Sequence, residues 1–78
     1  MIEILLFAQL QEDAGTDKLL IDGDGWTVKK LKNQLITQYQ LLQVEQSMVA
    51  INEAYALDSD EIHSGDIVAI IPPVSGGG

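Results

Sequence analysis

The sequence predicts a small α+β domain in which a mixed sheet of four or five strands packs against one main helix. Three observations lead to this prediction. The first and last apolar segments, residues 2–8 and 66–71, are the most hydrophobic, as neighbouring central strands would be. One segment of helical periodicity lies between them, over residues 28–39. The chain has 78 residues and no cysteine, so we expect one core without disulfides.

The N-terminal segment, residues 2–8, predicts a strand that begins the sheet. Side chains alternate along a strand, so one set faces the core and the other set, which includes Phe7, faces away. The core-facing set is expected to be Ile2, Ile4 and Leu6. Residues 9–14 lack β-branched side chains and are followed by Gly15, which predicts one or two helical turns with a glycine stop.

The main helix is predicted over residues 28–39, after a second strand at residues 18–22 and a glycine-containing turn. Thr27 is a suitable N-cap because its hydroxyl can accept a hydrogen bond from a first-turn N–H group. The apolar face of this helix is expected to contain Val28, Leu31, Leu35 and Tyr39, with Ile36 beside them. The opposite side carries Lys29, Lys30 and Lys32. We expect these lysines to form a solvated face, and a contact with an acidic patch on a partner is the alternative.

The second half of the chain predicts a hairpin, a polar loop and a last strand. In order, these are a strand at residues 47–51, a turn at 52–53, a strand at 54–57, a loop at 58–65 and a strand at 66–71. The last strand is rich in β-branched residues and is therefore expected to be buried. Residues 40–46 have no regular pattern and are expected to connect the helix to the hairpin.

This order of elements is that of the β-grasp, or ubiquitin-like, fold, with the first and last strands adjacent at the centre of the sheet. The sequence thus predicts a β-grasp domain over residues 1–71 and a flexible, extended glycine-rich tail over residues 72–78. The diproline at the start of this tail would end the last strand, because proline has no backbone N–H group to donate.

The formal net charge of −8 excludes several classes of function. The chain contains no arginine, so it lacks the basic surface that nucleic-acid binding requires. An anionic membrane would repel it, and no apolar run approaches the ~20 residues that span a bilayer. No signal peptide is recognised, since Glu3 interrupts the first apolar run. We therefore expect a cytoplasmic protein whose acidic surface suits basic partners.

No catalytic or metal-binding constellation is recognisable. His63 is the only histidine and is expected to be an exposed loop residue without a metal. The acidic residues of the loop at 58–66 do not fit a calcium-binding loop, because His63 occupies the position that requires glycine. We therefore expect that this chain binds no cofactor and is itself non-catalytic.

Two aromatic residues have more than one interpretation. Phe7 is expected on the side of its strand that faces away from the core. Either a helix covers that side, or Phe7 is exposed and marks an interface. Trp26 precedes the helix N-cap, where packing against the first helical turn is favoured over a binding role.

The composition changes abruptly in the tail. Two prolines stiffen the exit from the last strand, and small residues with three glycines follow. Seven residues can span about 23–25 Å when extended. Glycine has no Cβ, so such a segment could enter a narrow channel and bring its backbone close to an active site. The alternative is a flexible end or a linker without function.

The sequence resembles the small subunit of molybdopterin synthase, the MoaD-type sulfur carriers, over nearly its whole length. The matching elements are Phe7-Ala8, Glu12, Gly15, Val49-Ala50-Ile51-Asn52, Gly65-Asp66 and Pro72-Pro73-Val74-Ser75-Gly76-Gly77. The proline- and glycine-containing ending is the specific part. The family usually ends at the second glycine, whereas this chain continues with Gly78.

The resemblance implies a carrier whose terminal glycine holds sulfur as a thiocarboxylate. An E1-like enzyme would use ATP to adenylate Gly78, or Gly77 if Gly78 is absent in vivo, and a persulfide donor would supply the sulfur. The carrier would pass it to cyclic pyranopterin monophosphate within a heterotetramer with the large subunit. Family positions for partner docking match Phe7, Tyr55 and Ile71, and the tail that enters the partner consists of Pro73, Val74, Ser75, Gly76 and Gly77.

Two alternatives share the fold and the glycine ending. A thiamin-type sulfur carrier is disfavoured by the diproline and by Phe7-Ala8. A ubiquitin-like modifier would be attached to lysines of other proteins through its terminal glycine.

Overall fold

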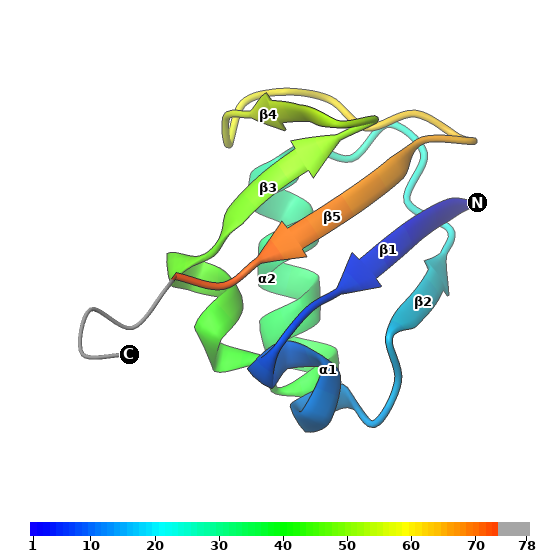
Figure 1. The fold of residues 1–78 in the computed structure, drawn as a ribbon. Helices are drawn as coiled ribbons and strands as arrows, with labels where there is room; N and C mark the ends of the chain where they lie inside the picture. Colours follow the sequence, from blue (N-terminus) through cyan, green and yellow to red (C-terminus); the bar gives the residue numbers. More distant parts are fainter. Residues whose placement is uncertain (74–78) are drawn as a thin grey trace.

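Five strands form one mixed sheet in the order β2-β1-β5-β3-β4 in the computed structural model, which describes residues 1–73 (Figure 1). The strands are β1 (Ile2–Leu6), β2 (Lys18–Ile21), β3 (Met48–Ile51), β4 (Ala54–Ala56) and β5 (Ile67–Ile71). β1 and β5 are parallel neighbours at the centre, and the other three pairs are antiparallel. The predicted β-grasp class is confirmed, with five strands.

Two α-helices and one 3-10 helix connect the strands. They are α1 (Gln9–Ala14), α2 (Val28–Tyr39) and the 3-10 helix η1 (Leu42–Gln46). The predicted cap of α2 is present, because the Thr27 hydroxyl accepts a hydrogen bond from the Lys30 N–H at 3.2 Å. Gly15 ends α1 with φ 74°, a left-handed conformation that glycine adopts at little cost. The segment predicted as an irregular connection forms η1.

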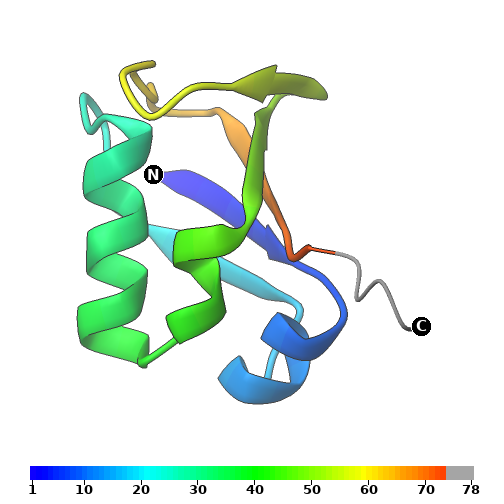
Figure 2. The same cartoon turned by 90° about the vertical axis from the view of Figure 1, so that its left-hand side faces the viewer.

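The core lies between the sheet and α2 (Figure 2). As predicted, alternate residues of β1 face it, and Ile2, Ile4 and Leu6 are fully or almost fully buried. The other strands and the helices contribute Val49, Val68, Ile70, Val28, Leu31, Leu35, Leu10 and Val44, and the connecting segments contribute Leu41 and Ile62. This single layer of branched aliphatic side chains provides the main hydrophobic stabilisation.

Two predicted assignments of the core are wrong. Tyr39 was expected on the buried face of α2 but is 41% exposed. The chain reverses at Gln40, where φ is 58°, and Leu41 is fully buried in the core cluster. Ile62 lies in the segment predicted to be a polar loop, yet it is fully buried. Its N–H donates to the Trp26 carbonyl at 2.7 Å, which holds this loop against the start of α2.

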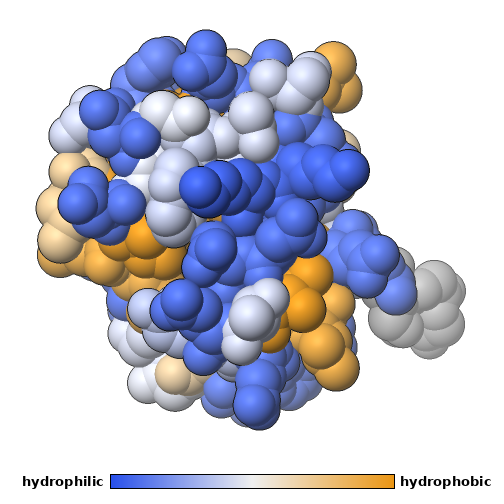
Figure 3. Space-filling model, turned by 180° about the vertical axis from the view of Figure 1, so that it is seen from behind, coloured by the Kyte–Doolittle hydropathy of each residue, from blue (hydrophilic) through white to orange (hydrophobic). Residues whose placement is uncertain are grey.

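The predicted solvated lysine face is present at Lys29 and Lys30, which are exposed, whereas Lys32 is partly buried. Lys32 pairs with Asp58 at 3.1 Å, and the ammonium of Lys30 lies 5.3 Å from the centre of the Trp26 ring. Trp26 is partly buried and packs against the core, as the packing interpretation of this residue predicts. The surface seen from behind is mostly hydrophilic, with separate apolar patches (Figure 3).

Candidate docking site

The face of the sheet opposite α2, here called the outer face, carries a row of apolar side chains and is not covered by a helix within residues 1–73 (Figure 2). The strand register brings Leu5, Ala69, Ala50 and Tyr55 into one row across β1, β5, β3 and β4. Each alternates along its strand with side chains that face the core. The fold therefore presents a second apolar layer to the exterior.

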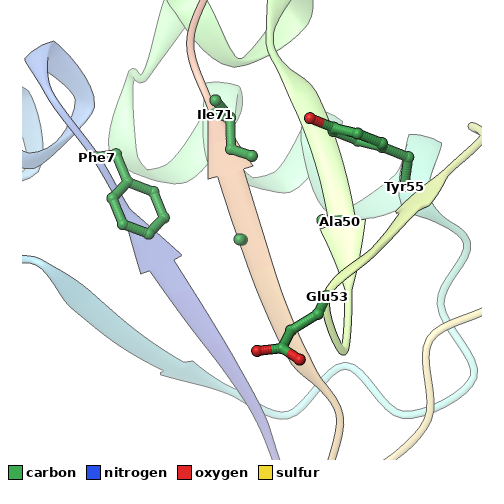
Figure 4. Close-up of a pocket in the computed structure, with 6 residues that line it drawn as sticks. Phe7, Ala50, Glu53, Tyr55 and Ile71 are labelled. Carbon is green, nitrogen blue, oxygen red and sulfur yellow. The ribbon is translucent and has the colours of Figure 1, made fainter.

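A hollow of about 520 Å³ lies in the middle of this outer face (Figure 4). Its lining residues are Phe7, Ala50, Glu53, Tyr55, Ala69 and Ile71, and we call it the Phe7–Tyr55 hollow. Small side chains at Ala50 and Ala69, which are paired across β3 and β5, leave space between the larger side chains around them. The hollow could accept an apolar side chain of a partner.

A second hollow of about 510 Å³ adjoins the first and shares Phe7, Glu53 and Ala69 with it. Its remaining lining residues are Leu5, Asn52 and Ile67. Tyr55 is 72% exposed, Phe7 45% and Ile67 44%. Apolar side chains that are exposed side by side are typical of an interaction surface rather than of isolated surface residues.

Phe7 is exposed, which excludes the interpretation that a helix covers this side of β1. Strand β1 ends at Leu6, and Ala8 adopts φ 52°, so the chain turns away immediately after Phe7. The Phe7 carbonyl accepts a hydrogen bond from Leu10 N–H in α1 at 3.1 Å. The aromatic ring is thus held at the edge of both hollows by the junction between β1 and α1.

The hairpin turn between β3 and β4 is fixed by a cluster of hydrogen bonds that we call the Asn52 clamp. Asn52 Nδ2 donates to Asp66 Oδ1, and Asn52 Oδ1 accepts from Ile67 N–H, both at 3.0 Å. Asp66 Oδ2 accepts from His63 N–H at 2.8 Å. The hydrogen bonds from the His63 backbone and from Asn52 lower the pKa of the Asp66 carboxyl, because they favour its charged form.

This clamp is not evident from the sequence, although Asn52 and Asp66 lie within the Val49–Asn52 and Gly65-Asp66 elements of the family resemblance. Asn52 and Glu53 have φ values of 50° and 72°, as in a tight two-residue hairpin. An asparagine in such a turn is a signal for hairpin geometry. Its contact with Asp66 depends on the pairing of β3 with β5, which the local sequence does not encode.

The three predicted docking residues lie around one hollow. Phe7 follows β1, Tyr55 is in β4 and Ile71 ends β5, and all three line the Phe7–Tyr55 hollow. After Ile71 the chain leaves the sheet through Pro72, which is partly buried, and Pro73, which is exposed. The other predicted tail residues, Val74, Ser75, Gly76, Gly77 and Gly78, lie outside the described residues.

Within residues 1–73, no three residues among histidine, aspartate and glutamate form a group that could hold a metal ion. None of the helices in that range is long and apolar enough to cross a membrane.

Comparison with known proteins relates this geometry to a family. The sequence model of the ThiS family matches residues 4–77. The chain belongs to the ThiS family. The molybdopterin synthase sulfur carrier subunit of Dictyostelium discoideum is 42% identical and that of Escherichia coli K12 is 33% identical. The alignments cover 96% and 99% of this chain and 94% and 100% of those relatives, so the predicted resemblance is confirmed.

Solved structures support the same assignment of the fold. SAMP1 from Haloferax volcanii is 31% identical, with a TM-score of 0.75 over 97% of this chain and 98% of that one. The complex of subunits 1 and 2 of the molybdopterin-converting factor from Helicobacter pylori includes a chain with a TM-score of 0.66 and 19% identity, over 97% of each chain. At that identity the second likeness shows the fold alone.

Proposed function

We propose that this ThiS-family chain is the sulfur carrier subunit of a molybdopterin synthase. The proposal is carried by one observation: the uncovered apolar hollow includes Ile71, the last residue before the chain leaves the sheet. A partner seated on this hollow would be adjacent to the beginning of the tail. Relatives that are 33–42% identical over nearly their whole length are named molybdopterin synthase sulfur carrier subunits, which supports the proposal.

The chemistry requires activation of the terminal carboxylate, because a carboxylate is a poor electrophile. A carboxylate oxygen of Gly78 attacks the α-phosphorus of ATP, and pyrophosphate leaves. The terminal sulfur of a persulfide donor then attacks the acyl carbon, and AMP leaves. A thiol cleaves the resulting acyl disulfide, which leaves a thiocarboxylate on the carrier and a disulfide on the donor. Gly77 takes this role if the protein ends there in vivo.

The carrier contributes a docking surface and a tail, whereas the partners contribute the catalysis. An E1-like adenylating enzyme binds ATP, and the large subunit binds cyclic pyranopterin monophosphate. Phe7, Tyr55 and Ile71 dock on the large subunit, and residues 73–77 enter its active site. The assembly is a heterotetramer with two carriers, and it works in the cytoplasm.

Intact-mass spectrometry tests the proposal directly. The full chain is incubated with the cognate activating enzyme, ATP and a persulfide donor, and the matched control is a variant that lacks residues 76–78. We expect the full chain, but not the truncated variant, to gain the mass of one oxygen-to-sulfur exchange. Fragmentation of the C-terminal peptide identifies the glycine that carries the sulfur. Absence of both adenylate and thiocarboxylate on the full chain would contradict the proposal.

A protein modifier is the second candidate. It is favoured by the similarity to SAMP1, since another solved structure from Haloferax volcanii, 28% identical, is described as small archaeal modifier protein 1. Isolation of the chain in isopeptide linkage to lysines of other proteins would support it. Co-purification with a molybdopterin synthase large subunit, without such conjugates, would favour the sulfur carrier over both the modifier and a thiamin-type carrier.

A further inference from the structure

Glu53 is the only charged residue that lines either hollow of the outer face in the described part of the chain. It lines both of them, and its carboxylate reaches over the sheet next to apolar side chains (Figure 4). An apolar partner surface pressed against this face would remove water from the carboxylate. Loss of hydration without a replacement partner disfavours a charged group strongly.

The chain itself offers no cation to Glu53. It has no arginine, and its four lysines are Lys18 on β2 and three residues of α2 on the other side of the sheet. Lys18 lies 3.8 Å from Glu3. Three strand spacings of about 4.8 Å each separate β2 from β3, which leads into the turn that contains Glu53. The amino group of Met1 donates to the Ser64 hydroxyl at 2.9 Å.

The position of Glu53 is well defined. The preceding residue is held by the Asn52 clamp, and Asn52 N–H also donates to the Ile67 carbonyl at 2.8 Å. The backbone of Glu53 is left-handed, with φ 72°, so the turn directs its side chain toward β5 rather than along β4. A carboxylate on a fixed turn can select the geometry of a partner, because little ordering is needed when the two bind.

We propose that Glu53 is a specificity residue of the docking surface, and that the partner places an arginine or lysine side chain on it, flanked by apolar side chains that occupy the two hollows. This inference rests on the proposed function and adds the chemistry of the contact. The apolar hollows would supply affinity, and Glu53 would supply selectivity. A surface with the same apolar side chains but no cation would leave the carboxylate desolvated and unpaired, and would therefore bind weakly.

The test compares Glu53→Gln and Glu53→Lys with wild type in binding to the cognate molybdopterin synthase large subunit at low and high salt. Glutamine retains the shape of the side chain, so the turn should be preserved. Glu61→Gln is the matched control, because Glu61 is an exposed glutamate that lines neither hollow. We expect Glu53→Gln to weaken binding about tenfold or more and Glu53→Lys further, with Glu61→Gln near wild type.

A rescue experiment then identifies the partner residue. Each lysine and arginine on the large-subunit surface is changed to glutamate, and one such variant should restore binding to Glu53→Lys. If Glu53→Gln binds as tightly as wild type, this inference is overturned while the proposed function stands. If wild type does not bind the large subunit at all, the proposed function is overturned, and the inference with it.

Discussion

The two faces of the sheet differ in kind although they are built from the same strands. The inner face carries large branched side chains sealed by α2, such as Ile4 and Ile70. The outer face carries alanines at its centre and Phe7, Tyr55 and Ile71 around them, open to the exterior. Alternation along each strand thus separates the residues that stabilise the domain from the residues that a partner can reach. Substitutions on the inner face should therefore lower stability, and substitutions on the outer face should weaken partner binding.

The largest expected effect on stability is at the inner face. Ile70→Ala should lower the free energy of unfolding by about 2–5 kcal/mol, because Ile70 is fully buried and its removal leaves a cavity. Ile67→Ala on the same strand is the matched control, since Ile67 is 44% exposed, and we expect a loss of about 1 kcal/mol or less. Urea unfolding followed by circular dichroism measures both. Equal losses of unfolding free energy in the two variants would show that the two faces contribute equally to stability.

The reverse pattern is expected for binding. Phe7→Asp should weaken binding to the large subunit about 30-fold or more, because it places a charge where an apolar anchor is proposed, and should change stability little. The control is Leu42→Asp, which introduces the same charge at an exposed leucine of η1 away from the outer face. Calorimetric titration of both variants makes the comparison. An unchanged affinity for Phe7→Asp would remove Phe7 from the docking surface.

The Asn52 clamp ties the turn between β3 and β4 to the start of β5, and its loss should have an intermediate effect. Asn52→Ala should destabilise the domain by about 1–2 kcal/mol, because the side-chain hydrogen bonds are lost and alanine is strained at φ 50°. Asn52→Gly loses the same bonds but tolerates the backbone. The difference in melting temperature between the two variants measures the strain, and identical values would contradict this account.

The smallest expected effect concerns pH. The pKa of Asp66 is lowered in the folded state, so this carboxylate contributes stability above its unfolded pKa, and the contribution is lost as pH falls through the folded value. Asp66→Asn should therefore be less stable than wild type at pH 5 to 7, and the difference should shrink below about pH 4. Thermal melts across this range test the sign. A difference that grows on acidification would exclude a lowered pKa as its cause.

Much of the inner face could be predicted from the sequence, because it follows from local rules. Alternation located Ile2, Ile4 and Leu6, and a threonine before a periodic apolar run located the start of α2. Tyr39 and Ile62 could not be assigned in this way. The exposure of Tyr39 depends on where the chain reverses after α2. The burial of Ile62 depends on a loop that packs against the start of that helix.

The candidate site could be predicted only in part. Phe7, Tyr55 and Ile71 were placed by resemblance, and the structure brings them around one hollow. The role of Glu53 and the Asn52 clamp was not predicted, because both depend on which strands are neighbours. Side chains that are far apart in the sequence form the hollow only after β3 and β1 have both paired with β5.

The parallel pairing of β1 with β5 also has a consequence for how the protein is made. The centre of the sheet joins β1 to β5, so the ribosome must have released all the residues from β1 to β5 before the sheet can close. Contacts of such wide sequence separation slow folding. The strand that closes the sheet is the one that brings Ile71 into the hollow. An incompletely folded chain would therefore lack the docking surface. It could not bind the partner until folding is complete.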